Sequence, residues 1–418
     1  MSTESGRKEI LAAAVLHIHR GWQMSGAVEL GKGLYWIGVK DPSLAVFDDL
    51  FPTEHGTTYN AYLVKGDTHT AIIDTVKRKR FDEFLEKVRS LTDPAEVDYI
   101  VVNHSEPDHS GSLALLLEHC PKATVISSQA ARTFLGNQIH HQFESQIVKD
   151  NDELDPGGRT LRFIAAPFLH WPDTMFTLLK EDGVLFSCDA FGSHFSAEGL
   201  FADEVPDFSG ETRFYFDCIM RPFKERILQA VAKLDGAELK MLCPSHGPIF
   251  RSDARKPVEL YRKWSMPKAA GRRVAIFYLS PHGNTEQMAE AVAKGAGAAG
   301  VHVTLCHINH ASVADIRDLM EECDALIFGT PTINRDIPKP MWDVLAYLST
   351  VSLKGNIGGI FGSYGWSGEA CRMLEERLKG MNFKLPVPFV RAAFMPKPEV
   401  LAECEALGRA VAEEVLKK

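Results

Sequence analysis

The sequence lacks paired cysteines. Its eight cysteines are scattered, and none forms a C-x-x-C pair. This spacing excludes the disulfide framework that holds small secreted domains together, and it fits a reducing cytoplasm. It also excludes a built-in iron–sulfur module of the rubredoxin type, which requires two such pairs.

Long apolar runs and long basic runs are missing as well. No stretch approaches the roughly 18 apolar residues that a membrane-spanning helix needs. The net charge of −9, without interleaved basic and aromatic residues, argues against nucleic acid as a partner. What the chain has is 418 residues, 45% of them hydrophobic, which is enough material for two cores. We therefore expect a cytoplasmic protein of two domains with no membrane or nucleic acid partner.

The first 27 residues differ from the rest of the chain. The apolar stretch 10–16 follows Arg7 and Lys8, as the core of a signal peptide would, but it is short and no clear cleavage site follows it. We expect residues 1–27 to form a short helical or partly ordered extension.

Side chains that bind metals are frequent from residue 104 to residue 246. Four of them fall within six residues, directly after the apolar run 97–103, which predicts a buried parallel strand. The other three follow predicted strands at 161–166, 183–188 and 239–243. The complete set is His104, Glu106, Asp108, His109, His170, Asp189 and His246.

With 16 histidines in the chain, some are expected near strand ends by chance. Taken alone, His170 or His246 is better explained as a surface or packed residue. The cluster 104–109 is different, since two imidazoles and two carboxylates so close together are electrostatically awkward without a cation. Seven donors are too many for one tetrahedral ion, so we expect two metals where the strands of one sheet end. The stretch 110–119 predicts a helix capped by Ser110.

The second half of the chain has three loops with phosphate-binding character. The predicted strands and the loops that follow them are 272–278 with 280–286, 324–329 with 330–334, and 358–361 with 362–368. The first loop leads into a helix that we expect to begin near Thr285, and hydroxyls and N–H groups at such a turn can hold a phosphate. Trp366 lies in a Gly-Trp-x-Gly loop tip, a poor place to bury a Trp, so we interpret Trp366 or Tyr364 as a ligand contact.

This half resembles a flavodoxin domain, in which flavin mononucleotide (FMN) lies at the topological switch point of a parallel sheet. The resemblance implies one FMN per chain. The predicted contacts are Ser280, His282, Gly283, Asn284, Thr285, Pro331, Thr332, Ile333, Asn334, Ser363, Tyr364, Gly365, Trp366 and Gly368. The first loop departs from the family, because Pro281 and His282 stand where a Met and an aromatic residue are common. Proline has no N–H, so one phosphate donor is lost.

The order of the metal ligands resembles the metallo-β-lactamase fold, whose hydrolases carry His-x-His-x-Asp-His at the same strand end. In this chain Glu106 replaces the second His of that motif. Together with the motifs at 170–173, 188–192 and 243–247, this replacement makes the chain similar to the flavodiiron proteins. A carboxylate in place of an imidazole hardens the site and favours iron or manganese over zinc.

The flavodiiron resemblance implies two irons per chain and a role for each ligand. One iron takes His104, Glu106 and His170, the other takes Asp108, His109 and His246, and Asp189 bridges them. It also implies an oxidoreductase that reduces O2 to water, NO to nitrous oxide, or both. Electrons pass through FMN from an external donor, either a rubredoxin-like protein or a reduced deazaflavin. A head-to-tail homodimer, or a dimer of such dimers, is implied as well.

The predicted fold is α/β with two domains. Residues 28–263 form a metallo-β-lactamase-like αββα sandwich, residues 264–271 a linker, and residues 272–418 a flavodoxin-like, doubly wound parallel sheet.

Two other functions remain open at this stage. The first is a di-zinc hydrolase of the metallo-β-lactamase type with an appended flavodoxin domain; Glu106 and the flavin loops count against it. The second is a flavin electron carrier or redox sensor without enzymatic activity, whose metal site is structural. The number of ligands counts against this alternative, because a structural site is closed by four.

Overall fold

The computed structural model describes residues 26–267 and 271–417, so the predicted extension at 1–27 lies almost entirely outside the described residues. The described chain forms two compact units. The first unit ends at Trp264, and the second runs from Ser265 to the C-terminus and includes the short segment Arg221–Lys224. Among the described residues, no helix has the length and apolar character that crossing a membrane requires.

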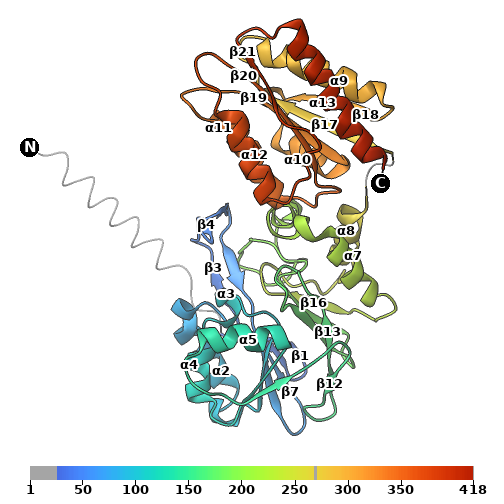
Figure 1. Ribbon diagram of the computed structural model, residues 1–418. Helices are drawn as coiled ribbons and strands as arrows, with labels where there is room; N and C mark the ends of the chain where they lie inside the picture. Colours follow the sequence, from blue (N-terminus) through green and yellow to red (C-terminus); the bar gives the residue numbers. More distant parts are fainter. Residues whose placement is uncertain (1–25, 268–270, 418) are drawn as a thin grey trace, which may run out of the picture. The chain divides into compact units, whose positions relative to one another are not determined.

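Two sheets form the centre of the first unit (Figure 1). The larger consists of β1 (Val28–Gly31), β2 (Leu34–Trp36), β7 (Tyr62–Lys65), β8 (Thr70–Ile73), β9 (Tyr99–Val102), β10 (Thr124–Ser127) and β11 (Ser145–Ile147), in that order. The smaller consists of β12 (Glu153–Leu154), β13 (Leu161–Ala165), β14 (Met175–Leu179), β15 (Val184–Cys188) and β16 (Met241–Pro244). Two small ladders pair β3 (Val39–Asp41) with β6 (Thr57–Tyr59), and β4 (Val46–Phe47) with β5 (Phe51–Pro52).

Helices cover the outer faces of both sheets. The covering helices include α2 (Phe81–Leu91), α4 (Leu113–His119), α5 (Gln129–Gln138) and α8 (Lys256–Ser265). The first unit also has α3 (Pro107–Ser110), α6 (Ser209–Tyr215) and α7 (Lys224–Lys233). One core lies between the larger sheet and α2, α4 and α5, and a second joins the two sheets face to face. On the other side, Tyr261 of α8 packs on Phe191, which contacts Phe176 of β14. The unit is an αββα sandwich, as predicted.

The strands that precede metal ligands differ from the prediction in one respect. β9 is parallel to both of its neighbours, as expected. However, it belongs to the larger sheet, whereas β13, β15 and β16 belong to the smaller one. The expectation of a single sheet was therefore wrong: the ligands come from matching edges of two stacked sheets.

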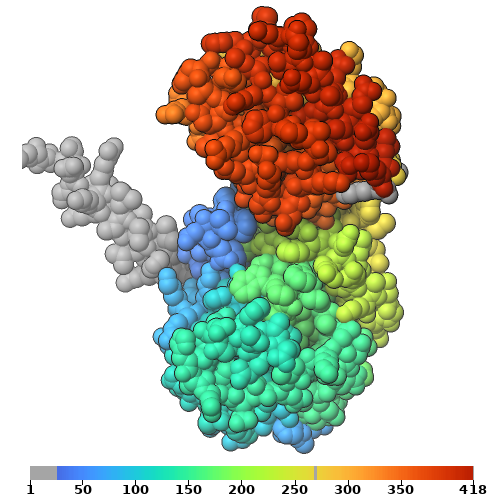
Figure 2. Space-filling model, viewed as in Figure 1, coloured from blue at the N-terminus to red at the C-terminus, as the bar shows by residue number. Residues whose placement is uncertain are grey.

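The second unit is a five-stranded parallel sheet with helices on both faces (Figure 1). Its strands, in spatial order, are β18 (His302–His307), β17 (Arg273–Tyr278), β19 (Ala325–Pro331), β20 (Ile357–Tyr364) and β21 (Val390–Ala393). In chain order this is 2-1-3-4-5, the flavodoxin arrangement. One face packs on α9 (Asn284–Ala298) and α13 (Pro398–Leu416), and the other on α10 (Val313–Glu322), α11 (Lys339–Tyr347) and α12 (Ala370–Gly380). In the space-filling view, the atoms of this unit that face the viewer are mostly orange and red (Figure 2).

The first two residues of the predicted linker, 264 and 265, belong to a helix. Helix α8 continues to Ser265, and Trp264 packs on Phe216 and Tyr261 of the first unit. Residues 268–270 lie outside the described part of the chain.

Candidate metal centre and flavin cavity

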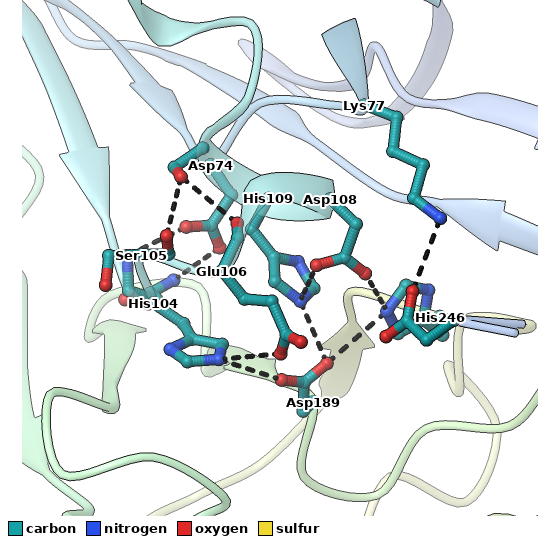
Figure 3. A network of polar contacts seen from close by, with 12 residues as sticks. Asp74, Lys77, His104, Ser105, Glu106, Asp108, His109, Asp189 and His246 are labelled. Carbon is teal, nitrogen blue, oxygen red and sulfur yellow. Dashed lines mark hydrogen bonds and ion pairs between the residues drawn. The ribbon is translucent and has the colours of Figure 1, made fainter. Parts of the chain in front are cut away.

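The seven predicted metal ligands lie together in the first unit and form two groups around Asp189. Figure 3 labels all of them except His170. In the first group, His104 Nε2 and His170 Nε2 lie 3.2 and 3.0 Å from Glu106 Oε2. The same two nitrogens lie 3.7 and 3.6 Å from Asp189 Oδ2. Four side chains from three separate loops thus surround one position.

The second group uses the other oxygen of Asp189. His109 Nε2 lies 3.0 Å and His246 Nε2 lies 3.4 Å from Asp189 Oδ1. Asp108 completes this group, with Oδ2 at 3.0 Å from His246 Nε2 and Oδ1 at 3.3 Å from His109 Nε2. Because each oxygen of Asp189 faces its own group, this carboxylate is placed to bridge two ions.

The backbone just before Asp189 is held in an uncommon conformation. Cys188, the last residue of β15, has a φ of 50°, in the left-handed region that non-glycine residues rarely adopt. Such a conformation costs about 1–2 kcal/mol. Asp74, with a φ of 57°, is a second case at the adjoining edge, and its carboxylate accepts bonds from the backbone N–H and the side chain of Asn103. Functional sites often hold such strain.

Buried groups bind the Nδ1 atoms of two imidazoles and so orient the rings. His104 Nδ1 lies 3.1 Å from both oxygens of Asp173, and Asp173 also accepts bonds from the N–H and hydroxyl of Ser105. His246 Nδ1 donates to the carbonyl oxygen of Thr58 at 2.6 Å. These bonds fix the tautomers that leave each Nε2 facing the site, as metal-ligating histidines require.

The charges in the cluster support one another. Burial raises the pKa of Asp189, but the charge of His109 and the close polar contacts with His109 and His246 bring it well below its usual value. Burial likewise raises the pKa of Glu106, and hydrogen bonds from His104 and His170 reverse this and lower it. In turn, burial lowers the pKa of His246, whereas its bonds and charge interactions with acidic neighbours raise it to about 10. Protonated imidazoles here neutralise the carboxylates, which is a task that cations could take over.

The flavin loops of the second unit also converge. The cavity at the carboxyl ends of β17, β19 and β20 is lined by Ser280, Pro281, His282, Asn284, Thr285, Pro331, Thr332, Ile333, Ser363, Tyr364, Gly365, Trp366 and Phe394. The Thr285 and Ser363 hydroxyls, from two of these loops, lie 2.9 Å apart. Trp366 lines the cavity and is 75% exposed, so it is not a core residue.

Three predicted contacts shape the loops without lining the cavity. Gly283 has a φ of 77° at the start of α9. A Cβ at Gly368 would come within 2.9 Å of the Tyr364 ring. Asn334, with a φ of 53°, lies in the turn that Ile333 and Asp336 close by mutual backbone hydrogen bonds.

Comparisons with known proteins agree with this arrangement. Residues 57–247 match the family described as "ODP family beta lactamase", and residues 276–408 match "Flavodoxin". "Type A flavoprotein fprA" of Rhodobacter capsulatus is 38% identical over 400 residues, which cover 94% of this chain and 92% of that protein. "Flavo-diiron protein FprA2" of Clostridium acetobutylicum is 37% identical, over 93% of this chain and 100% of that protein.

A solved structure gives the same result. The rubredoxin oxygen:oxidoreductase of Desulfovibrio gigas superposes with a TM-score of 0.68 at 31% identity, and covers 94% of this chain and 99% of that one. The chain belongs to the flavodiiron protein family. As a flavodiiron protein it is a flavoprotein oxidoreductase whose cofactors are FMN and a di-iron pair.

The residues present fit these cofactors. Among the described residues, the buried polar atoms without a hydrogen-bond partner include Asp108 Oδ1, His109 Nε2 and Asp189 Oδ2, although buried polar atoms normally have one. All three belong to the metal cluster, where an ion would satisfy them. Four imidazoles and three carboxylates suit iron better than a thiolate-rich set would.

Sequence reasoning missed three parts of these sites. Asp173 was seen only as part of a motif and not as the partner of His104, although a carboxylate behind a ligating His is a common arrangement. Phe394 follows β21 at the edge that carries the other flavin loops, which is the same signal that found those loops. The carbonyl of Thr58 gave no signal, because every residue has one.

Proposed function

We propose that this flavodiiron protein reduces O2 to water, NO to nitrous oxide, or both, at the di-iron site. The proposal rests on the way the two oxygens of Asp189 face two separate groups of side chains. Oδ1 lies 3.0 and 3.4 Å from the Nε2 atoms of His109 and His246. Oδ2 lies 3.6 and 3.7 Å from the Nε2 atoms of His170 and His104. A bridged pair of metals can bind a diatomic molecule and deliver two electrons together, which a single structural ion does not do.

The protein side chains have separate tasks in this proposal. His104, Glu106 and His170 would hold one iron, Asp108, His109 and His246 would hold the other, and Asp189 would contribute one oxygen to each. Asp173 and the Thr58 carbonyl keep two of the imidazoles in the ligating tautomer. Tyr215 donates from its hydroxyl to Asp189 Oδ1 at 3.1 Å and so holds the bridging carboxylate in place.

Reduction of O2 to water requires electrons from both cofactors. When bound, FMN would supply up to two electrons received from an external donor, and a reduced iron pair would supply two more. Reduction of O2 to two waters takes four electrons and four protons, whereas two NO give nitrous oxide and one water with two of each. We propose a rubredoxin-like protein or a reduced deazaflavin as the donor.

The names of two relatives support these substrates. A protein of Moorella thermoacetica that is 37% identical over 94% of this chain is named "Nitric oxide reductase". The Desulfovibrio gigas neighbour, at 31% identity, is titled a rubredoxin oxygen:oxidoreductase.

We further propose that the functional domains are 28–263 and 272–418, and that the protein works in the cytoplasm as a head-to-tail dimer or a dimer of dimers. Fewer than ten residues separate the end of α8 at Ser265 from the start of β17 at Arg273, which limits how one chain can bring its own two cofactors together. Pairing between subunits avoids this limit.

Metal analysis, a visible spectrum and gas-consumption assays on the purified protein test the proposal. We expect about two irons and one FMN per chain, with O2 or NO consumed when the flavin is kept reduced. Zinc at full occupancy together with β-lactamase or thioesterase activity would show a hydrolase instead. A flavin that cycles without consuming either gas would indicate an electron carrier.

A further inference from the structure

The flavin cavity is almost without charge. Among the 13 described residues that line it, none is Lys, Arg, Asp or Glu, and His282 alone can carry a positive charge. The phosphate of FMN, by contrast, carries close to two negative charges at neutral pH. A cavity for FMN therefore has to meet this charge with neutral donors and with His282.

One hydroxyl donor at these loops is already in use, because the Thr285 and Ser363 hydroxyls lie 2.9 Å apart and one donates to the other. Ser280 Oγ accepts a bond from the backbone N–H of Glu286 at 3.0 Å, so its own O–H remains a neutral donor. Pro281 has no N–H to offer. The start of α9 still contributes backbone N–H groups, because the first residues of a helix have no partner within it. Next to this helix start, between Pro281 and Gly283, the exposed ring of His282 lines the cavity.

Charged residues on the surrounding elements have other partners. Glu286, in the first turn of α9, accepts a bond from the Tyr278 hydroxyl at 3.2 Å. In the loop after β19, Arg335 pairs with Glu369 at 3.2 Å. On β21, Arg391 lies over the Tyr364 ring, 5.7 Å from its centroid. Because none of these side chains lines the cavity, they do not replace His282 as the nearest source of positive charge.

We propose that His282 binds the phosphate of FMN and makes the site selective for the phosphorylated flavin over riboflavin. The proposal rests on the assignment of this cavity to FMN and deepens it. An imidazole donates one N–H when neutral and two when protonated, and a hydrogen bond to a charged oxygen is stronger than a neutral one. Proline at 281 removes a backbone donor, and the histidine beside it supplies a side-chain donor in its place.

The test compares two ligands on full-length protein from which the flavin has been removed. FMN and riboflavin are titrated by the quenching of flavin fluorescence, for the natural sequence and for His282→Gln, His282→Lys and His310→Gln. His310 is a matched control, because it is an exposed histidine of the same unit outside the cavity. We expect His282→Gln to weaken FMN binding roughly tenfold and to leave riboflavin binding unchanged, because only FMN has the phosphate.

The other variants sharpen the result. His282→Lys should bind FMN about as well as the natural sequence, and His310→Gln should match it for both ligands. Unchanged riboflavin binding also shows that the variant cavity is folded. If riboflavin binds too weakly to titrate, the phosphorus NMR signal of bound FMN decides, since His282→Gln should shift it and His310→Gln should not.

Two results would overturn the role of His282. The first is an equal loss of affinity for both flavins, which would place the ring against the isoalloxazine or in the structure of the loop. The second is no change for FMN together with an unmoved phosphorus signal. A natural protein that binds neither flavin would instead refute the assignment of the cavity to FMN.

Discussion

Asp173 shows how a residue that touches no ion can decide whether a metal site works. Its carboxylate is buried, takes two bonds from Ser105 and faces His104 Nδ1 with both oxygens. Burial raises its pKa, and the hydrogen bond and charge of His104 reverse this and lower it. Asp173 therefore stays ionised and increases the basicity of the imidazole that it orients.

Asp173→Asn should consequently weaken iron binding while the fold is kept. Loss of such a partner typically lowers metal affinity by about 10- to 100-fold. Iron retained per chain during competition with a chelator is the measurement. Asp235→Asn is the control, because Asp235 is an exposed carboxylate paired with Arg262. If both variants retain the same amount of iron, Asp173 has no role in metal binding.

Iron binding should also release protons. Among the ligands, the imidazoles of His104 and His109 have a raised pKa, and that of His246 is raised to about 10. Metal ligation needs the neutral imidazole, so an ion has to displace these protons. Since a raised pKa keeps the proton bound until the pH passes it, affinity should rise with pH from neutral towards about 10. Titration of the metal-free protein with Fe2+ in a weakly buffered solution of a pH-indicator dye measures the protons released. If no protons are released at pH 7, these imidazoles are not protonated in the metal-free protein.

For single residues, the sequence predicted the features that depend on the chemistry of the side chain itself. The seven side chains that the structure brings together were predicted as a set because they follow buried strands. Ser110 was wrongly expected to cap a helix. Its hydroxyl donates to the Ser105 carbonyl, and the helix begins later, at Leu113. Whether the Ser110 hydroxyl caps a helix or donates to the Ser105 carbonyl depends on how the chain folds around the site. The sequence pattern near Ser110 does not contain that information.

Among the helices, α9 and α13 of the second unit lie unusually close together. A Cβ at Gly295 would lie 1.9 Å from the carbonyl oxygen of Glu405, and one at Gly408 would lie 2.0 Å from that of Val292. Glycine is needed at both positions so that the two backbones can touch. Helix α9 begins at the first flavin loop, so its position also sets the position of that loop.

Gly295→Ala should force these helices apart and lower the free energy of unfolding by about 1–3 kcal/mol. Gly297→Ala is the matched control in the same helix. A Cβ there meets nothing within 4 Å, so this change should stabilise the helix by roughly 0.5–1 kcal/mol. Denaturant unfolding followed by FMN release measures both. If the two alanines have the same effect, the close helix contact is not important for stability.

Elements were predicted better than their assembly. Hydrophobic runs placed β9, β13, β15 and β16 within a few residues, since buried strands are apolar throughout. The division of these strands between two sheets was missed, because strand order depends on contacts between distant residues. In the second unit, the order 2-1-3-4-5 followed from the flavodoxin resemblance and not from periodicity.

For the whole molecule, the dimer proposal predicts that two inactive variants can restore each other. His104→Ala removes an iron ligand, and a double change of Asn284 and Thr285 to Asp repels the flavin phosphate. In a mixed dimer, one intact flavin meets one intact iron pair. Subunit exchange of equal amounts should then recover about a quarter of the natural activity, because half of the dimers are mixed and each has one working pair.

Mass spectrometry of differently labelled chains would show whether exchange takes place. Mixing either variant with itself is the control and should recover nothing. Exchange without recovered activity would mean that electrons pass between the two cofactors of one chain.

In the proposed arrangement each cofactor is held by one continuous half of the chain, and this has a consequence for the order in which the protein matures. The side chains of the metal cluster end at His246, whereas the proposed flavin cavity is incomplete until Phe394. A chain that grows from its N-terminus, and whose domains fold as they emerge, therefore finishes its iron-binding half first. Iron can enter during synthesis, while FMN has to wait until the chain is nearly complete.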